Sequence, residues 1–118
     1  MYVNSVAVVG NLTSDPRQGE GDGKVVNFRM AVNRRRNPSE EQAEDAVERT
    51  EFMDVECWGA QADNISASLH RGDRTIVVGQ LKYDQWEDAD GNPRSRIGIR
   101  ASAVGPSLEF QGIRAKAE

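Results

Sequence analysis

Residues 50–59 constrain the fold of this chain most, because they alternate with the two-residue period of a β-strand. One face of that strand is apolar and consists of Met53, Val55 and Cys57. The other face combines two aromatic residues with two acids: Phe52, Trp58, Asp54 and Glu56. Large aromatic rings on a hydrophilic face indicate either a binding surface or cover by a neighbouring element. From this strand alone, the two interpretations are about equally favoured.

The length and the cysteine content predict one cytoplasmic domain. A chain of 118 residues fits a single modest core, and we expect a domain over residues 1–112 and a short tail over residues 113–118. Its one cysteine, Cys57, cannot form an internal disulfide and falls on the apolar face of its strand. The N-terminus shows no secretory signal, and no apolar run approaches the roughly 20 residues of a membrane helix. We therefore expect a cytoplasmic protein that does not contact a membrane.

Acidic and basic residues are segregated along the sequence. The formal net charge of −4, taken as a sum, argues against a nucleic-acid partner. The acids, however, crowd into residues 40–56, whereas most of the arginines lie outside that segment. A chain with this distribution can carry a basic groove on an acidic body.

Two other expected strands, at residues 2–12 and 75–81, are apolar on both faces. A small barrel covers only the inner face of its strands, so we infer that another subunit covers the outer face. The last expected strand shows a clearer alternation of apolar and polar residues. Its alternate residues Ile97, Ile99, Ala101 and Ala103 are expected to face the core.

The order of the elements predicts an all-β fold. Residues 60–71 carry apolar side chains at helical spacing and are followed by Gly72, so we expect a short helix there. Turns rich in glycine or aspartate are expected at residues 19–23 and 88–92, and a long loop at residues 37–49. The resulting β-β-β-α-β-β order is typical of the OB-fold, a five-stranded Greek-key barrel with one short helix between strands 3 and 4.

Catalysis is not favoured. The single histidine, His70, is expected in the last turn of the helix, where it interacts favourably with the helix dipole. No cluster of histidine and cysteine offers a metal site, and the acids gather in a loop or on an exposed face. We expect a protein that is not an enzyme and needs no metal or cofactor.

The outward aromatic and basic residues together predict a surface for single-stranded nucleic acid. Basic side chains track phosphates, and aromatic faces stack on bases of any sequence. Duplex cannot use such faces, because its bases are already stacked on each other. The candidate binding residues are Arg29, Arg34, Arg35, Arg36, Phe52, Trp58, Arg74, Lys82, Tyr83, Trp86, Arg94 and Arg96.

Several separated motifs are similar to those of bacterial single-stranded DNA-binding proteins. They are VGNLTSDP at residues 9–16, EF at 51–52, WG at 58–59, GDR at 72–74, VGQL at 78–81 and WED at 86–88. The resemblance covers residues 2–110 and implies an OB-fold, a homotetramer and single-stranded DNA wrapped over the subunits. It also implies that Phe52, Trp58 and Trp86 occupy the positions of the stacking aromatics, and that the protein is associated with the nucleoid.

The sequence departs from the family pattern in two places. Family members often carry a further aromatic residue near position 36, where this chain has Arg34, Arg35 and Arg36. The family also usually has a long tail with an acidic tip that recruits replication and repair proteins, and this sequence shows neither. Recruitment of such partners stays open, as do two alternative functions: an accessory OB-fold interaction module of a replication complex, and a binder of single-stranded RNA.

Overall fold

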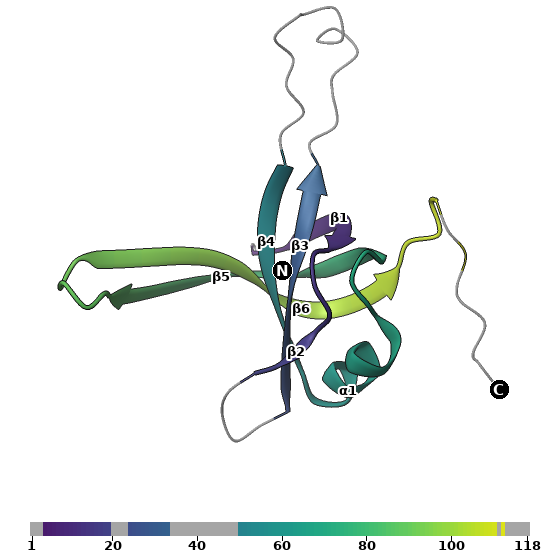
Figure 1. Ribbon diagram of the computed structural model, residues 1–118, viewed down its shortest axis with the longest axis horizontal. Coiled ribbons are helices and arrows are strands. Elements are labelled where there is room, and N and C mark those ends of the chain that lie inside the picture. The colour runs from purple at the N-terminus through teal and green to yellow at the C-terminus, as the bar shows by residue number, and fades with distance from the viewer. Residues whose placement is uncertain (1–3, 20–23, 34–49, 111, 113–118) are drawn as a thin grey trace, which may run out of the picture.

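The computed structural model describes residues 4–19, 24–33, 50–110 and 112 (Figure 1). The predicted loop at 37–49, the arginines at 34–36 and the tail at 113–118 lie outside these residues. The elements are β1 (Val6–Leu12), β2 (Arg17–Gln18), β3 (Val25–Asn33), β4 (Thr50–Trp58), α1 (Gly59–Ser68), β5 (Arg74–Glu87) and β6 (Pro93–Pro106).

Five of the strands form a ring with the connectivity of an OB-fold. The order in the sheet is β1-β5-β6-β4-β3, and β3 pairs again with β1 through residues 11–12 and 30–31. The pairing of β4 with β6 is parallel, whereas the other pairings are antiparallel. The predicted fold class is confirmed, although the ring is not a regular barrel. A two-residue strand that the sequence did not predict, β2, adds to the edge of β3.

The ring encloses a core built from alternate residues of its strands. The largest fully buried side chains include Met30, Val55, Val77 and Ile99. Cys57 is also fully buried, and this burial, together with the neighbouring Glu56 charge, raises the pKa of its thiol to about 12. The predicted apolar face of residues 53–57 is therefore confirmed, and Cys57 packs as a small apolar side chain.

The helix is shorter than predicted. It ends at Ser68, and the next residue, Leu69, has extended backbone angles. Gly72 has a φ of +89° but belongs to the turn before β5, so it is not the helix cap that the sequence suggested. His70 lies beyond the helix, where its backbone N–H donates a hydrogen bond of 2.8 Å to the Asp73 carboxylate. The expected interaction of His70 with the last helical turn is therefore wrong.

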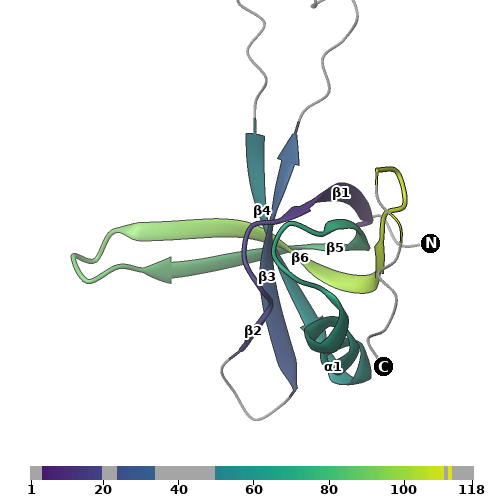
Figure 2. The same ribbon diagram turned by 45° about the vertical axis from the view of Figure 1, so that its right-hand side comes forward.

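The β5–β6 hairpin extends beyond the ring as a long arm (Figures 1 and 2). Its turn was predicted, and the Asp88 carboxylate accepts hydrogen bonds of 2.9 Å from the backbone N–H groups of Asp90 and Asn92. Ile97 lies on the arm, where no core lies beneath it, and is 55% exposed. The prediction that Ile97 faces the core is wrong for this reason.

A β-bulge in β6 also changes which of its residues face the core. Val78 pairs with Ala103 while Gly79 pairs with Ala101, so Ser102 is an extra residue in β6. One extra residue reverses which parity points inward, and Ala103 is exposed whereas Ala101 is partly buried. The prediction that the side chain faces the core is correct for Ile99 and wrong for Ala103.

The two strands predicted to be apolar on both faces are neighbours in the sheet. Ala7 pairs with Val78, and Val9 pairs with Ile76. All four side chains are exposed in the single chain, and with Ala103 they form what we call the aliphatic face. Among the described residues, no helix is long and apolar enough to cross a membrane.

Candidate nucleic-acid interface

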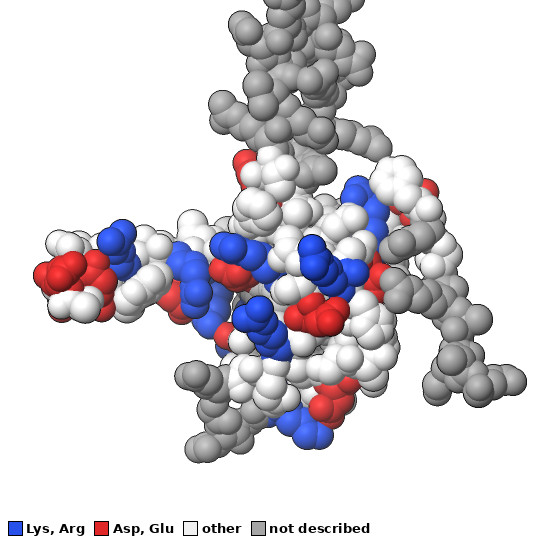
Figure 3. Space-filling model, viewed as in Figure 1, with Lys and Arg blue, Asp and Glu red and all other residues white. Residues whose placement is uncertain are grey.

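The outward side chains of β3, β4, β6 and β5 form one charged surface, because these four strands are neighbours in that order. A groove of about 650 Å³ crosses this surface. We call it the channel and define it by its charged lining residues: Arg17, Arg29, Asp54, Glu56, Lys82, Asp84 and Arg96. Lys and Arg side chains are interspersed with Asp and Glu on the face seen in Figure 3.

The strand register aligns these side chains. Arg29 pairs with Asp54, Asp54 pairs with Gly98, and Gly98 pairs with Lys82. Gly98 is close to the neighbouring strand, since an added Cβ would lie 3.0 Å from the Asp54 carbonyl oxygen. Because Gly98 has no side chain, it leaves a shallow floor across which residues of β5 can reach β4.

The three predicted stacking aromatics are all exposed next to the channel. Phe52, Trp58 and Trp86 are 55%, 43% and 47% exposed, and each lies two residues from a lining carboxylate on its own strand. The sequence left open whether a neighbouring element covers the outward aromatic residues of β4, and none of the described residues buries them. Exposed flat rings at the edge of a charged groove can stack on unpaired bases.

An arginine lies over each of these three rings. The distances from the guanidinium carbon to the ring centroid are 5.3 Å for Arg29 and Phe52, 5.4 Å for Arg100 and Trp58, and 5.7 Å for Arg96 and Trp86. These distances fit cation–π contacts. Each ring therefore already has a flat, positively charged partner that can remain beside a stacked base or move aside for it.

Arg29, Lys82 and Arg96 of the channel form ion pairs with its carboxylates. Lys82 Nζ lies 2.5 Å from Glu56 Oε2 and 3.6 Å from Asp84 Oδ2, and the Arg29 and Asp54 side chains approach to 3.4 Å. The hydrogen bond to Glu56 is the main reason that the pKa of Lys82 is raised. Since four basic and three acidic residues line the channel, its charge is nearly balanced before a ligand binds.

Glu56 is the most connected of these acids. Burial raises the pKa of its carboxyl, but hydrogen bonds from Lys82 and Trp58 and the Lys82 and Arg100 charges outweigh that effect. The net pKa is lowered, so the group is a carboxylate at neutral pH. Trp58 Nε1 donates a hydrogen bond of 2.6 Å to Glu56 Oε1.

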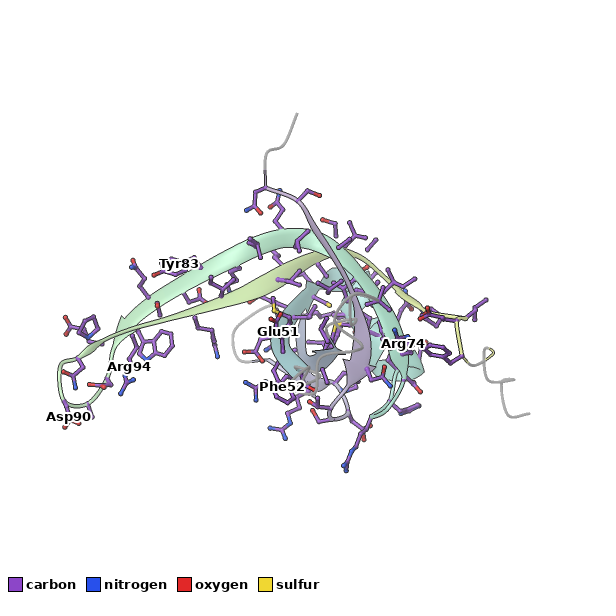
Figure 4. The ribbon with its side chains drawn as sticks, turned by 90° about the horizontal axis from the view of Figure 1, so that it is seen from above. Glu51, Phe52, Arg74, Tyr83, Asp90 and Arg94 are labelled. Atoms are coloured by element: carbon purple, nitrogen blue, oxygen red, sulfur yellow. The ribbon has the colours of Figure 1, made fainter. Side chains whose placement is uncertain are left out.

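Two further predicted binding residues, Arg94 and Tyr83, lie on opposite sides of the arm. Arg94 pairs in register with Trp86 and lies 3.0 Å from the Asp88 carboxylate, so it belongs to the arm beside the channel. Tyr83 points from the opposite side of the arm, as Figure 4 shows, with Ile97 as its cross-strand neighbour. Tyr83 and Trp86 therefore lie on opposite sides of the arm, because residues an odd number apart in a strand face opposite sides.

Arg74 also lies away from the channel. Its guanidinium donates hydrogen bonds of 2.9 Å to Glu109 and 3.1 Å to the Asn11 side chain, and it lies 4.9 Å from the Phe110 ring centroid. Arg74 begins β5 whereas Trp86 is near its end, a separation of about 40 Å along an extended strand. Arg74 is not among the residues that line the channel, and its contacts hold the segment after β6 against β1.

Arg100 is a candidate that the sequence prediction left out. The sequence places Arg100 on the same face of the last strand as Arg94 and Arg96, and this alternation could have identified it. Its position over Trp58 depends on the parallel pairing of Glu56 with Arg100, which joins strands far apart in the sequence. Among the described residues, no group of three or more His, Cys, Asp or Glu side chains could hold a metal ion.

Comparison with known proteins places these features in a family. A family model described as "Single-strand binding protein family" matches residues 3–107. The single-stranded DNA-binding protein of Corynebacterium glutamicum is 38% identical over 109 residues, which cover 90% of this chain and 48% of that protein. The protein of the same name from Treponema pallidum is 36% identical over 118 residues, which cover 98% of this chain and 64% of that protein. The chain thus spans about half to two-thirds of the length of these relatives.

Proposed function

Because the chain belongs to the single-strand binding protein family, we propose that it binds and protects single-stranded DNA with little sequence preference. The observation that carries the proposal is the row of three exposed rings, each beneath an arginine, along one charged channel. The proposed contacts are base stacking on the rings of Phe52, Trp58 and Trp86 and phosphate contacts to the arginine and lysine side chains. Stacking contributes roughly 1–3 kcal/mol per base, so three rings can supply most of the affinity.

The contacts predict a preference for unpaired strands. A base in a duplex is stacked on both faces and cannot lie on a protein ring without being extruded. An arginine stacked on a base does not distinguish one base from another. We expect the protein to serve replication, recombination or repair, in which unpaired DNA must be protected.

A fluorescence titration tests this function. The chain contains two tryptophans, Trp58 and Trp86, and both belong to the proposed surface. We expect oligo(dT) to quench their emission strongly at low salt and less at high salt, because phosphate contacts release counterions. Duplex DNA of the same length should produce little change. Absence of quenching by oligo(dT) at low salt would contradict the proposal.

The same titration separates the two alternative functions. Equal or tighter binding of oligo(rU) would favour an RNA ligand. For an accessory module, replacing Phe52, Trp58 and Trp86 by alanine would leave any residual DNA affinity unchanged in a folded protein.

We also propose that the protein is a homotetramer. Support comes from the aliphatic face, where Ala7, Val9, Ile76 and Val78 form a continuous apolar surface on paired strands. Such a surface is favourable once another apolar surface removes it from water. Light scattering at micromolar concentration should report four protomers, and a monomeric mass would contradict this proposal.

The cellular setting follows from the same ligand. We propose a cytoplasmic, nucleoid-associated protein without catalytic activity, whose partner is single-stranded DNA. Contacts with replication and repair proteins are a further proposal, which co-purification from cells under DNase treatment would test.

A further inference from the structure

The Trp58 indole is held at two positions, at its edge and over its face. Its Nε1 donates a hydrogen bond of 2.6 Å to Glu56, and the Arg100 guanidinium lies 5.4 Å from the ring centroid. Both partners come from the sheet itself, since Glu56 precedes Trp58 by two residues and pairs in register with Arg100. An exposed ring at the end of a strand would otherwise exchange among several rotamers.

Glu56 is itself held in place. Lys82 Nζ lies 2.5 Å from its second carboxylate oxygen, and the Glu56 side chain is only 18% exposed. Lys82 reaches β4 from β5, two strands away, across the position of Gly98. The two oxygens of one carboxylate thus join a stacking ring to a cation of the channel.

The charge of a carboxylate at this position is unfavourable for binding DNA, so its presence indicates another role. It repels phosphates and competes with them for Lys82. We infer that Glu56 is a positioning residue, which holds the Trp58 indole in the orientation that stacks on a base. The DNA-binding part of this inference rests on the proposed function, whereas the ordering of the free ring does not.

The two effects of Glu56 on DNA binding have opposite signs and can be separated. Loss of its charge should strengthen binding of any oligonucleotide, with or without bases. Loss of its hydrogen-bond acceptor should weaken only the binding that depends on stacking. Glu56→Gln removes the charge but keeps a side-chain oxygen that can accept from the indole N–H. Glu56→Ala removes both, and Glu56→Leu removes both while keeping most of the side-chain volume.

The experiment compares oligo(dT) with an abasic oligonucleotide of the same length, measured by anisotropy of a dye on the DNA. We expect all three variants to bind the abasic strand a few-fold more tightly than the wild type. The ratio of oligo(dT) affinity to abasic affinity should stay near the wild-type value in Glu56→Gln. In Glu56→Ala and Glu56→Leu it should fall by roughly fivefold, because the base stacks on a less ordered ring.

A matched control removes a different carboxylate from the channel. Asp54→Asn removes one negative charge from the same strand, β4. The Asp54 side chain contacts Arg29, whereas Trp58 is hydrogen-bonded to Glu56. We expect this variant to strengthen binding of both oligonucleotides and to leave their ratio unchanged. The inference is overturned if the ratio is equal in the Glu56→Gln and Glu56→Ala variants.

A second readout needs no DNA. In a Trp86→Phe background Trp58 is the only tryptophan, so its time-resolved anisotropy reports the motion of that ring. Glu56→Ala should add a fast component that Glu56→Gln lacks, and identical decays in the two variants would overturn the inference. If the wild type fails to bind oligo(dT), the proposed function fails, whereas this measurement still decides whether Glu56 holds the ring.

Discussion

The channel and the aliphatic face are both exposed, and β5 contributes to both. Ile76 and Val78 lie in the first half of the strand, and Lys82, Asp84 and Trp86 follow on the same side of it in the second half. Val78 is 38% exposed and Trp58 is 43% exposed, so exposure alone does not tell the two regions apart.

Their chemistry does distinguish them. The rings beside the channel are flat, are covered by guanidinium groups and alternate with charged residues. The aliphatic face consists of alanine, valine and isoleucine on paired strands. Flat rings can stack on bases, whereas branched aliphatic side chains can only be removed from water by another apolar surface. The neighbours of an exposed apolar residue therefore indicate which kind of partner it contacts.

The largest expected effect is the loss of all three rings. The Phe52→Ala, Trp58→Ala, Trp86→Ala variant should bind oligo(dT) at least about a hundredfold more weakly, because each stacked base contributes roughly 1–3 kcal/mol. Anisotropy titration measures the affinity, and light scattering of the same sample should show unchanged assembly. A change in assembly together with affinity would mean that the two faces are not independent.

A charge on the aliphatic face should have the opposite outcome. Val78→Asp would place an unpaired carboxylate in the proposed subunit contact, which is costly once water is excluded. We expect smaller species by light scattering at micromolar concentration. Binding of an oligonucleotide short enough for one protomer should change by less than about threefold, since the channel is not altered. An unchanged mass would contradict the assignment of this face to a subunit contact.

Two arginines offer an intermediate test of the same comparison. Arg100→Ala should weaken oligo(dT) binding by roughly fivefold and reduce the salt dependence by about one phosphate contact. Arg74→Ala should leave DNA affinity unchanged and loosen the segment after β6, because its contacts are with Asn11, Glu109 and Phe110. Hydrogen exchange of residues 107–110 measures the second effect. Weakened DNA binding in Arg74→Ala would return this residue to the binding surface.

The smallest expected effect concerns pH and Glu56. Its carboxyl pKa is lowered from an ordinary value of 4.5 in the folded protein, so its ionised form stabilises the fold above that pH. This contribution is lost as the pH falls through the lowered pKa. Urea unfolding from pH 7 to pH 3 should show Glu56→Gln less stable than the wild type at pH 7, with a gap that closes in acid. A gap that does not depend on pH would mean that the carboxylate charge adds nothing.

Much of the fold could be predicted from residue alternation and turn chemistry. The two faces of β4, the outward positions of Arg29 and Trp86 and the turn at Asp88 follow from short-range backbone geometry. The same alternation places Tyr83 on the side of β5 opposite to Trp86. The early end of α1 was less predictable, since residues 69–71 continue a plausible helical pattern.

The amino-acid sequence by itself determined which side of each strand a residue occupies, because the two-residue period is a local property of the extended backbone. Only the tertiary structure decided which outward residues meet. The parallel pairing of β4 with β6 brings Arg100 to Trp58, the bulge at Ser102 turns Ala103 outward, and the arm carries Ile97 away from the core. These outcomes depend on how distant strands close into one ring, and no local pattern contains that information.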